Sequence, residues 1–133
     1  IDYHRFHFPD NGKILDSYRI NGLLHSVNPL ALKQMPDILF SNEREVTILD
    51  TENFGRVALI EVGALCVGKI VQTFNGKQFN RADEKGFFLF GGSTVIVIGE
   101  KNKWVPSQDI LKNSEGGMET FIKLGDAVAR AVI

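Results

Sequence analysis

A serine directly after two glycines is the first candidate for chemistry in this chain. The segment "GGST" (91–94) lies between the apolar runs "FFLF" (87–90) and "TVIVIG" (94–99). The glycine before Ser93 leaves its own carbonyl sterically open, and a tight turn can hold the serine hydroxyl close to that carbonyl. With a base to take the proton, Ser93 could attack the carbonyl of Gly92 and break the chain there. The same residues also fit a two-residue β-hairpin turn, so both interpretations stay open.

Two histidines near the start of the chain are the candidate bases. His4 and His7 occur in "HRFHFP" (4–9), where Phe6, Phe8 and Pro9 favour a strand over a helix. An odd separation on a strand sends two side chains to opposite faces, unless a bulge or the strand end redirects one of them. A metal site would need a third ligand, and His25 is the one histidine left. Two half-buried histidines on a sheet are therefore the simpler interpretation.

The composition limits the class of protein. The 133 residues predict one domain with a real core, spanning 1–133. The chain is 44% hydrophobic and 23% charged, as in ordinary globular proteins, and its net charge of −1 argues against a nucleic-acid partner. Cys66 is the single cysteine, which excludes a disulfide within the chain. The most apolar stretch (57–68) contains Glu61 and is too short to span a bilayer.

The elements that must position these residues are mostly strands. Short runs rich in Val, Ile, Phe and Thr, separated by Gly, Asn and Asp, predict a mainly β, compact antiparallel sandwich or barrel-like core with short helical turns. The expected strands are 2–8, 13–20, 44–50, 56–63, 66–74, 87–90, 94–99 and 118–126. Residues 26–42 contain two prolines and predict a long loop with at most one helical turn, and 75–86 predict a polar loop. Residues 107–113 predict a short helix capped by Ser107.

The remaining charges carry less information. The segments "NEREVT" (42–47) and "RADEKG" (81–86) mix signs, which favours solvated faces over sites. Glu61 interrupts an apolar run, and it is either a buried carboxylate with a partner or an outward residue of an edge strand. Alternation cannot decide between these two positions.

Taken together, the segments resemble the phosphatidylserine decarboxylases, a family of pyruvoyl-dependent enzymes. The resemblance runs in the family's order through "DYHRFHFPDNG", "SVNPLAL", "NEREVTILDTENFG", "IEVGALCVG" and "DEKGFFLFGGST", and more weakly through "FIKLGDAVA". It covers most of residues 2–94. The pair "HRFHFP" and "GGST", with "SVNP" and "VGA" between them, is its most specific part. Where many members have glycine before "DE", this chain has Ala82, for which we expect a modest change in turn geometry.

The resemblance implies a mechanism. The chain would cleave itself between Gly92 and Ser93, and Ser93 would become an amino-terminal pyruvoyl group, the cofactor. That group forms a Schiff base with the substrate amine and acts as an electron sink while carbon dioxide leaves. The resemblance further implies that His7 is the base for self-cleavage and that His4 assists decarboxylation.

The resemblance also implies partners and a location. The substrate is phosphatidylserine at a membrane surface, the product is phosphatidylethanolamine, and the precursor becomes two associated pieces; a homodimer stays open. The full-length protein is expected to be a peripheral membrane protein. The chain begins at Ile1 without Met, so we expect a fragment that lacks the family's upstream segment with its relay aspartate. We therefore expect an unprocessed form with an intact bond between Gly92 and Ser93.

Two alternatives stay open from the sequence. One is a non-catalytic or unmatured β-domain of the same lineage. The other is a relative that decarboxylates a free amino acid, although "SVNP" (26–29) favours the phospholipid branch.

Overall fold

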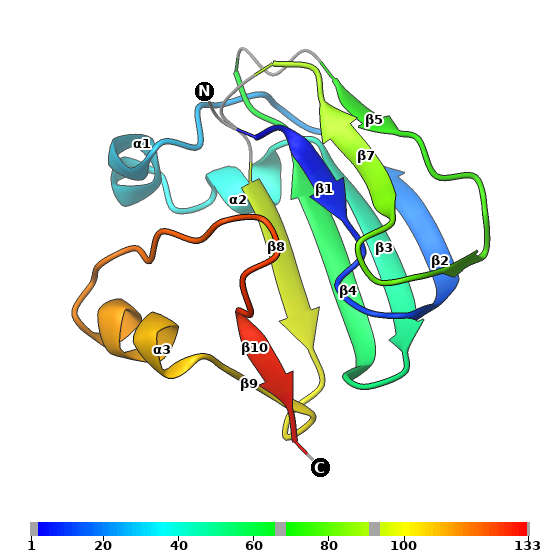
Figure 1. Cartoon of the computed structure of the whole chain (residues 1–133). Coiled ribbons are helices and arrows are strands. Elements are labelled where there is room, and N and C mark those ends of the chain that lie inside the picture. Colours follow the sequence, from blue (N-terminus) through cyan, green and yellow to red (C-terminus); the bar gives the residue numbers. More distant parts are fainter. Residues whose placement is uncertain (1–2, 66–68, 91–93, 133) are drawn as a thin grey trace.

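The computed structural model of the chain describes residues 3–65, 69–90 and 94–132. Its largest element is a five-stranded antiparallel sheet (Figure 1). The strand order in this sheet is β6-β2-β3-β4-β8. These strands are β6 (Gln78–Phe79), β2 (Gly12–Ile20), β3 (Arg44–Thr51), β4 (Gly55–Val62) and β8 (Thr94–Gly99). Consecutive Val, Ile and Leu residues, with two Thr residues in β3, give β3 and β4 the composition of central strands.

A smaller antiparallel sheet lies over one face of the large one. Its order is β1-β7-β5, from β1 (Arg5–His7), β7 (Glu84–Phe88) and β5 (Ile70–Gln72). Figure 1 shows β1 and β7 in front of β3 and β4. A separate two-stranded ribbon pairs β9 (Trp104–Pro106) with β10 (Ala129–Ala131). The mainly β antiparallel prediction is confirmed, and the described strands form an open pair of sheets instead of a closed barrel.

The core between the five-stranded and the three-stranded sheet contains two apolar clusters. One contains Phe8 and Phe79, whose rings stack with centroids 4.0 Å apart, together with Leu49, Val57 and Leu59 of the central strands. The other joins residues of the smaller sheet to the end of β4, and its members are Phe6, Ala64, Ile70 and Phe88. Burial of these side chains is the main force that holds the sheets together.

The strands on either side of "GGST" do not form a hairpin. β7 pairs with β1 and β5, whereas β8 pairs with β4 in the other sheet. The hairpin interpretation of Gly91-Gly92 is therefore wrong, and the chain crosses here from one sheet to the other. Adjacent apolar runs with two glycines between them satisfy a hairpin and a sheet-to-sheet crossing equally well, because each strand's partner is chosen by distant residues.

The connection between β2 and β3 contains more helix than predicted. α1 (Pro29–Gln34) and α2 (Ile38–Ser41) replace the long loop expected at 26–42. Asn28 caps α1, since its side-chain oxygen accepts a hydrogen bond of 2.8 Å from the Ala31 amide, and Pro29 occupies the first helical turn. The motif "SVNP" thus has a local structural role as a helix start.

The last third of the chain also differs from the prediction. α3 (Gln108–Glu115) follows Ser107 as expected, but the Ser107 hydroxyl donates to the Ala127 carbonyl instead of capping the helix. The strand expected at 118–126 is wrong, and the last strand is β10. The polar loop expected at 75–86 contains β6 and the beginning of β7. Within the described residues β1 and β5 are shorter than the strands expected at 2–8 and 66–74, whereas β7 begins three residues earlier and ends two residues earlier than the strand expected at 87–90.

Candidate active site

His7 is fixed at the end of β1 by hydrogen bonds to both ring nitrogens. Its Nδ1 lies 2.9 Å from the carbonyl oxygen of Ala82, and its Nε2 lies 2.7 Å from the hydroxyl of Tyr3. A carbonyl oxygen can only accept, so Nδ1 must carry the proton. In the neutral ring, Nε2 then has the free lone pair and accepts from Tyr3. This is the tautomer that a general base needs, with the basic nitrogen on the side away from its anchor.

The anchor of His7 is a turn with unusual backbone geometry. Ala82 has φ of 69°, in the left-handed region that favours glycine. The turn is closed by the Ala82 amide, which donates to the Phe8 carbonyl at 2.9 Å. A side chain at this position therefore bears the strain that glycine would avoid, and the carbonyl that orients His7 belongs to the strained residue.

His4 lies just before β1 and is held through its backbone. Its carbonyl oxygen accepts from the Phe88 amide at 2.8 Å, at the end of β7 that leads into "GGST". The hydrogen bonds of His25 are likewise made by its backbone, to the buried side chain of Asn42 and to the Leu65 amide. The three histidines thus differ in how their side chains are held. Only His7 has its ring fixed by hydrogen bonds among the described residues.

β7 contains a β-bulge where it pairs with β1. Phe6 is opposite Gly86 and His7 is opposite Glu84, so Lys85 is an extra residue on β7. A bulge can redirect side chains, and here it lets Lys85 and Gly86 both face the interior. Gly86 is required by packing, since a Cβ there would lie 2.2 Å from the Val71 carbonyl oxygen. The extra residue lies on β7, so the bulge redirects Lys85 and does not insert a residue between His4 and His7.

Gly92 and Ser93 lie outside the described residues, and so does the bond between them. The described chain reaches Phe90 on one side and resumes at Thr94 on the other. Thr94 begins β8 and is opposite Val62 at the end of β4. The expected intact peptide between Gly92 and Ser93 stays a prediction.

A buried ion pair connects the two sheets close to His7. Lys85 Nζ donates to Glu61 Oε2 at 2.8 Å and to Gln72 Oε1 at 2.9 Å. The exposed fractions of the two charged side chains are 3% and 0%. Gln72 also donates to Glu61 Oε2 at 3.1 Å, and the Lys85 ammonium lies 5.4 Å from the centre of the Phe6 ring. Glu61 is thus a buried carboxylate with a partner, which resolves the alternative that alternation left open.

The second carboxylate oxygen of this pair has no partner. Glu61 Oε1 is buried and makes no hydrogen bond within the described part of the chain. Burial raises the pKa of the Glu61 carboxyl above its ordinary value, and Lys85 opposes this shift without cancelling it. Glu45 lies directly opposite Glu61 on β3 and adds to the rise, while Arg19 binds Glu45 at 2.7 Å.

Two charged segments that sequence reasoning assigned to solvent are partly buried. Lys85 in "RADEKG" is buried, and so are Asn42 and Glu45 in "NEREVT". The solvated-face interpretation is wrong for these residues because the bulge and the partner sheet bring them inside. No local pattern marks Lys85 as an interior residue. Tyr3 was missed as well, although its place in "YHRFH" four residues before His7 was a visible clue.

Asp10 forms another buried polar contact, at the turn after β1. Its carboxylate accepts from the Asn53 amide at 2.7 Å, from the Asn53 side chain at 2.9 Å and from Arg81 at 2.8 Å. Burial works against ionisation, but these hydrogen bonds, with Arg81 first, outweigh it and lower the pKa of the Asp10 carboxyl. The contact holds the turn residues Arg81 and Ala82 beside β1.

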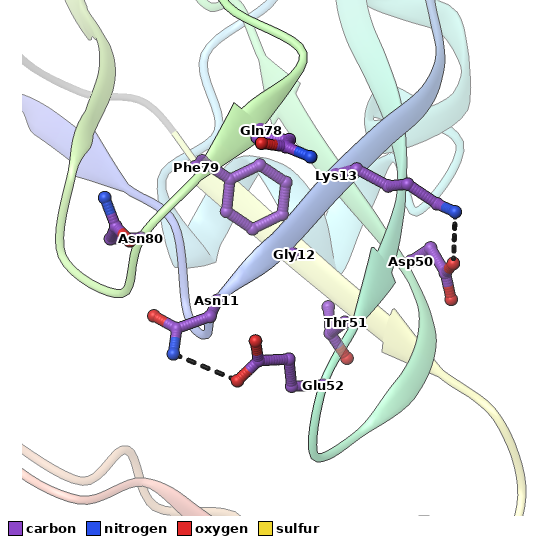
Figure 2. A pocket seen from close by; sticks show the side chains of 9 residues that line it. All are labelled: Asn11, Gly12, Lys13, Asp50, Thr51, Glu52, Gln78, Phe79 and Asn80. Carbon is purple, nitrogen blue, oxygen red and sulfur yellow. Dashed lines mark hydrogen bonds and ion pairs between the residues drawn. The ribbon is translucent and has the colours of Figure 1, made fainter.

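One cavity is lined by none of the three histidines. It has a volume of about 510 Å³, at the end of the large sheet where β2, β3 and β6 meet (Figure 2). Its charged and polar side chains pair with one another, as Lys13 does with Asp50 at 3.3 Å and Asn11 with Glu52 at 3.1 Å. A smaller cavity of about 230 Å³ borders the Lys85 and Gln72 side chains. Across residues 3–65, 69–90 and 94–132, no cluster of three or more His, Cys, Asp or Glu side chains could hold a metal ion.

The chain holds the His7 ring by two hydrogen bonds and carries "GGST" between strands that pair in different sheets, and its sequence is similar to those of known proteins. The family model described as "Phosphatidylserine decarboxylase" matches residues 1–130. The chain belongs to the phosphatidylserine decarboxylase family. This assignment agrees with the resemblance seen in the motifs.

Individual relatives agree with the family assignment. A protein of Clostridium tetani named phosphatidylserine decarboxylase proenzyme is 48% identical over 130 residues, which is 97% of this chain and 44% of the relative. Proteins of the same name from Ruminiclostridium cellulolyticum and Clostridium botulinum are 44% and 46% identical, over 99% and 96% of this chain and 44% and 43% of the relatives. The chain therefore spans less than half the length of these curated relatives. None of the described helices is long and apolar enough to cross a membrane.

Proposed function

We propose that the protein containing this chain is a phosphatidylserine decarboxylase that matures by cutting itself between Gly92 and Ser93. The name "proenzyme" of the relatives supports a precursor that is processed. The observation that carries the proposal for this chain is the state of His7. Its Nδ1 is committed to the Ala82 carbonyl, so Nε2 is the nitrogen that can accept the serine proton once the Tyr3 hydroxyl, which now donates to it, moves away.

The stacking of the sheets supports a meeting of His7 and Ser93. His7 is opposite Glu84 on β7, and the next residue, Lys85, reaches across to Glu61 on β4. Glu61 is opposite Val95, which is two residues after Ser93. The contact between Lys85 and Glu61 thus connects the neighbour of the His7 strand partner with the strand partner of Val95.

In the proposed cleavage, His7 Nε2 takes the proton of the Ser93 hydroxyl while the oxygen attacks the Gly92 carbonyl carbon. The C–N bond breaks, the nitrogen receives a proton, and an ester joins Gly92 to the Ser93 oxygen. Loss of the Ser93 α-proton then expels the Gly92 carboxylate by β-elimination. Water replaces the nitrogen of the resulting dehydroalanine, and ammonia and a pyruvoyl group are produced.

The second reaction is decarboxylation. The pyruvoyl group supplies an electron sink for the pair left behind when carbon dioxide departs. We assign His4 the proton that the substrate carbon must receive. Its backbone bond to Phe88, four residues before Gly92, supports this assignment, since it ties His4 to the strand that leads to the cleavage site.

The substrate we propose is phosphatidylserine at a membrane surface, with the protein bound peripherally. The exposed apolar side chains in and between the first two helices, Leu30, Met35 and Phe40, are consistent with contact to lipid. A free amino acid as substrate and a non-catalytic β-domain are the alternatives that the experiment must separate.

The test uses the full-length protein, the variant Ser93→Ala and vesicles that contain phosphatidylserine. The wild type should give two pieces on a denaturing gel, and the smaller should begin at position 93 with a carbonyl in place of an amino group by mass spectrometry. Ser93→Ala should stay whole and release no carbon dioxide. A wild type that stays whole, or a smaller piece with a free amino-terminal serine, would contradict the proposal. Carbon dioxide from free serine but not from vesicles would indicate the amino-acid alternative.

A further inference from the structure

Lys85 and Glu61 form a polar link between the sheet that carries His7 and the sheet that contains β8, the strand directly after Ser93. Lys85 follows Glu84, the strand partner of His7, and Glu61 is the strand partner of Val95. The 2.8 Å contact between them crosses from the smaller sheet to the larger one. On the described chain, β7 and β8 share no strand pairing, so their relative position depends on contacts between the sheets.

Stability alone is a weak reason for such a pair. Removing two charges from water costs much of what their attraction returns, and apolar residues of similar size often stabilise a protein as well or better. Lys85 is moreover an inserted residue, whose bulge interrupts the pairing of β1 with β7. Bulges of this kind occur often beside active sites, where they direct a side chain.

The geometry of the pair is well defined. Gln72 of β5 donates to the same Glu61 oxygen that accepts from Lys85, and its own oxygen accepts from Lys85. Three side chains from β4, β5 and β7 therefore close a ring of hydrogen bonds. The Phe6 ring lies beside the ammonium, directly before His7 in the chain. Such a ring resists sliding of one sheet over the other more than apolar contacts do, because hydrogen bonds depend on direction.

We infer that the Glu61–Lys85–Gln72 ring is a positioning device for self-cleavage, which holds His7 in register with the beginning of β8. The inference rests on the proposed function and adds residues to its mechanism. These three side chains are positioning residues, since they act through the strands that carry His7 and Ser93. A displacement of about 1 Å in such a site can reduce a rate about 100-fold.

The decisive variant is the double substitution Glu61→Leu and Lys85→Met in the full-length protein. It removes both charges, so neither is left unpaired in the core, and it keeps similar side-chain volumes. We expect the variant to fold with a melting temperature close to that of the wild type and to cleave itself at least tenfold more slowly. Cleavage is followed on denaturing gels from pH 5 to pH 9. The pH at the midpoint of the rate profile should not move, because His7 itself is unchanged, while the plateau should fall.

A matched control separates position from stability. Val57→Ala creates a cavity at the other end of β4, where Val57 is opposite Gly99. It should lower the melting temperature and leave the cleavage rate within twofold of the wild type. Gln72→Leu removes one member of the ring without leaving a new unpaired charge, and should slow cleavage at least threefold.

The inference is overturned if the double variant folds and cleaves within twofold of the wild-type rate, or if Val57→Ala slows cleavage as much as the double variant does. Should the double variant not fold, a normal cleavage rate of Gln72→Leu overturns it instead. His7→Ala and Ser93→Ala are measured in the same assay. If these two block cleavage and the ring variants do not, only the positioning role fails; if these two also cleave normally, the proposed function fails.

Discussion

The hydroxyl of Tyr3 lies 2.7 Å from His7 Nε2, on the nitrogen that would take the proton of Ser93. The two rings are also nearly parallel, with an interplanar angle of 18° and centroids 5.8 Å apart. Tyr3 is more than half exposed, so the contact can open. In the state described, Tyr3 therefore occupies the lone pair that the serine needs.

The variant Tyr3→Phe tests this competition. It keeps the ring and removes the hydroxyl, and a single hydrogen bond contributes about 0.5–1.5 kcal/mol net. We expect self-cleavage about 2- to 10-fold faster than in the wild type, measured by quenched samples on a gel. Tyr18→Phe, on β2, is the control and should leave the rate unchanged. A slower Tyr3→Phe variant would mean that Tyr3 orients His7 instead of blocking it.

The two histidines should separate under substitution. His7→Ala removes the proposed base and should slow cleavage by about 10²- to 10⁴-fold. His4→Ala should cleave at a near-normal rate and then release carbon dioxide poorly from phosphatidylserine vesicles. Cleavage and carbon dioxide release are measured on the same preparation. Equal maturation of the two variants would disprove the division of roles.

Ala82 offers a gain in stability. Its φ of 69° is strained for a residue with a Cβ, whereas glycine adopts it freely. We expect Ala82→Gly to raise the free energy of unfolding by about 0.5–1 kcal/mol, as measured by urea denaturation. Asn102 has φ of 66° but is a residue type that tolerates this region, so Asn102→Gly should change stability by less. A destabilised Ala82→Gly would show that the side chain contributes packing that outweighs the strain.

Two buried carboxylates should give opposite dependences of stability on pH. The raised pKa of Glu61 means that the folded state holds a proton that the unfolded state has already lost. The contribution of Glu61 to the free energy of unfolding should therefore fall as the pH rises from about 4.5 through the pKa of Glu61 in the folded state. The lowered pKa of Asp10 has the reverse effect. The contribution of Asp10 to the free energy of unfolding is present above about pH 3.9 and is lost as the pH falls through the pKa of Asp10 in the folded state.

Urea denaturation of Glu61→Gln and Asp10→Asn between pH 3 and pH 8 measures these contributions. The free energy of unfolding of the wild type minus that of Glu61→Gln should decrease as the pH rises above about 4.5. The free energy of unfolding of the wild type minus that of Asp10→Asn should decrease as the pH is lowered. Identical pH slopes in all three proteins would contradict both assignments.

The sequence by itself determined the family and much of the local structure. The β texture, the strands over 13–20, 44–50, 56–63 and 94–99, and the helix after Ser107 follow from short-range patterns of apolar and turn-forming residues. The motifs around His4, His7 and Ser93 indicated the family before any fold was known. These features depend on residues a few positions apart, which a linear pattern records.

Only the tertiary structure decided which strands pair and which charges are buried. The hairpin that "GGST" also allowed does not form, because β8 pairs with β4 and β7 pairs with β1 and β5. Lys85 is buried at a bulge that shifts the alternation of β7 by one residue. Its side chain binds Glu61, which lies 24 residues earlier on another strand. The tautomer of His7 depends on a carbonyl 75 residues later. Contacts over such separations are set by the packing of whole sheets, and no local spacing in the chain encodes them.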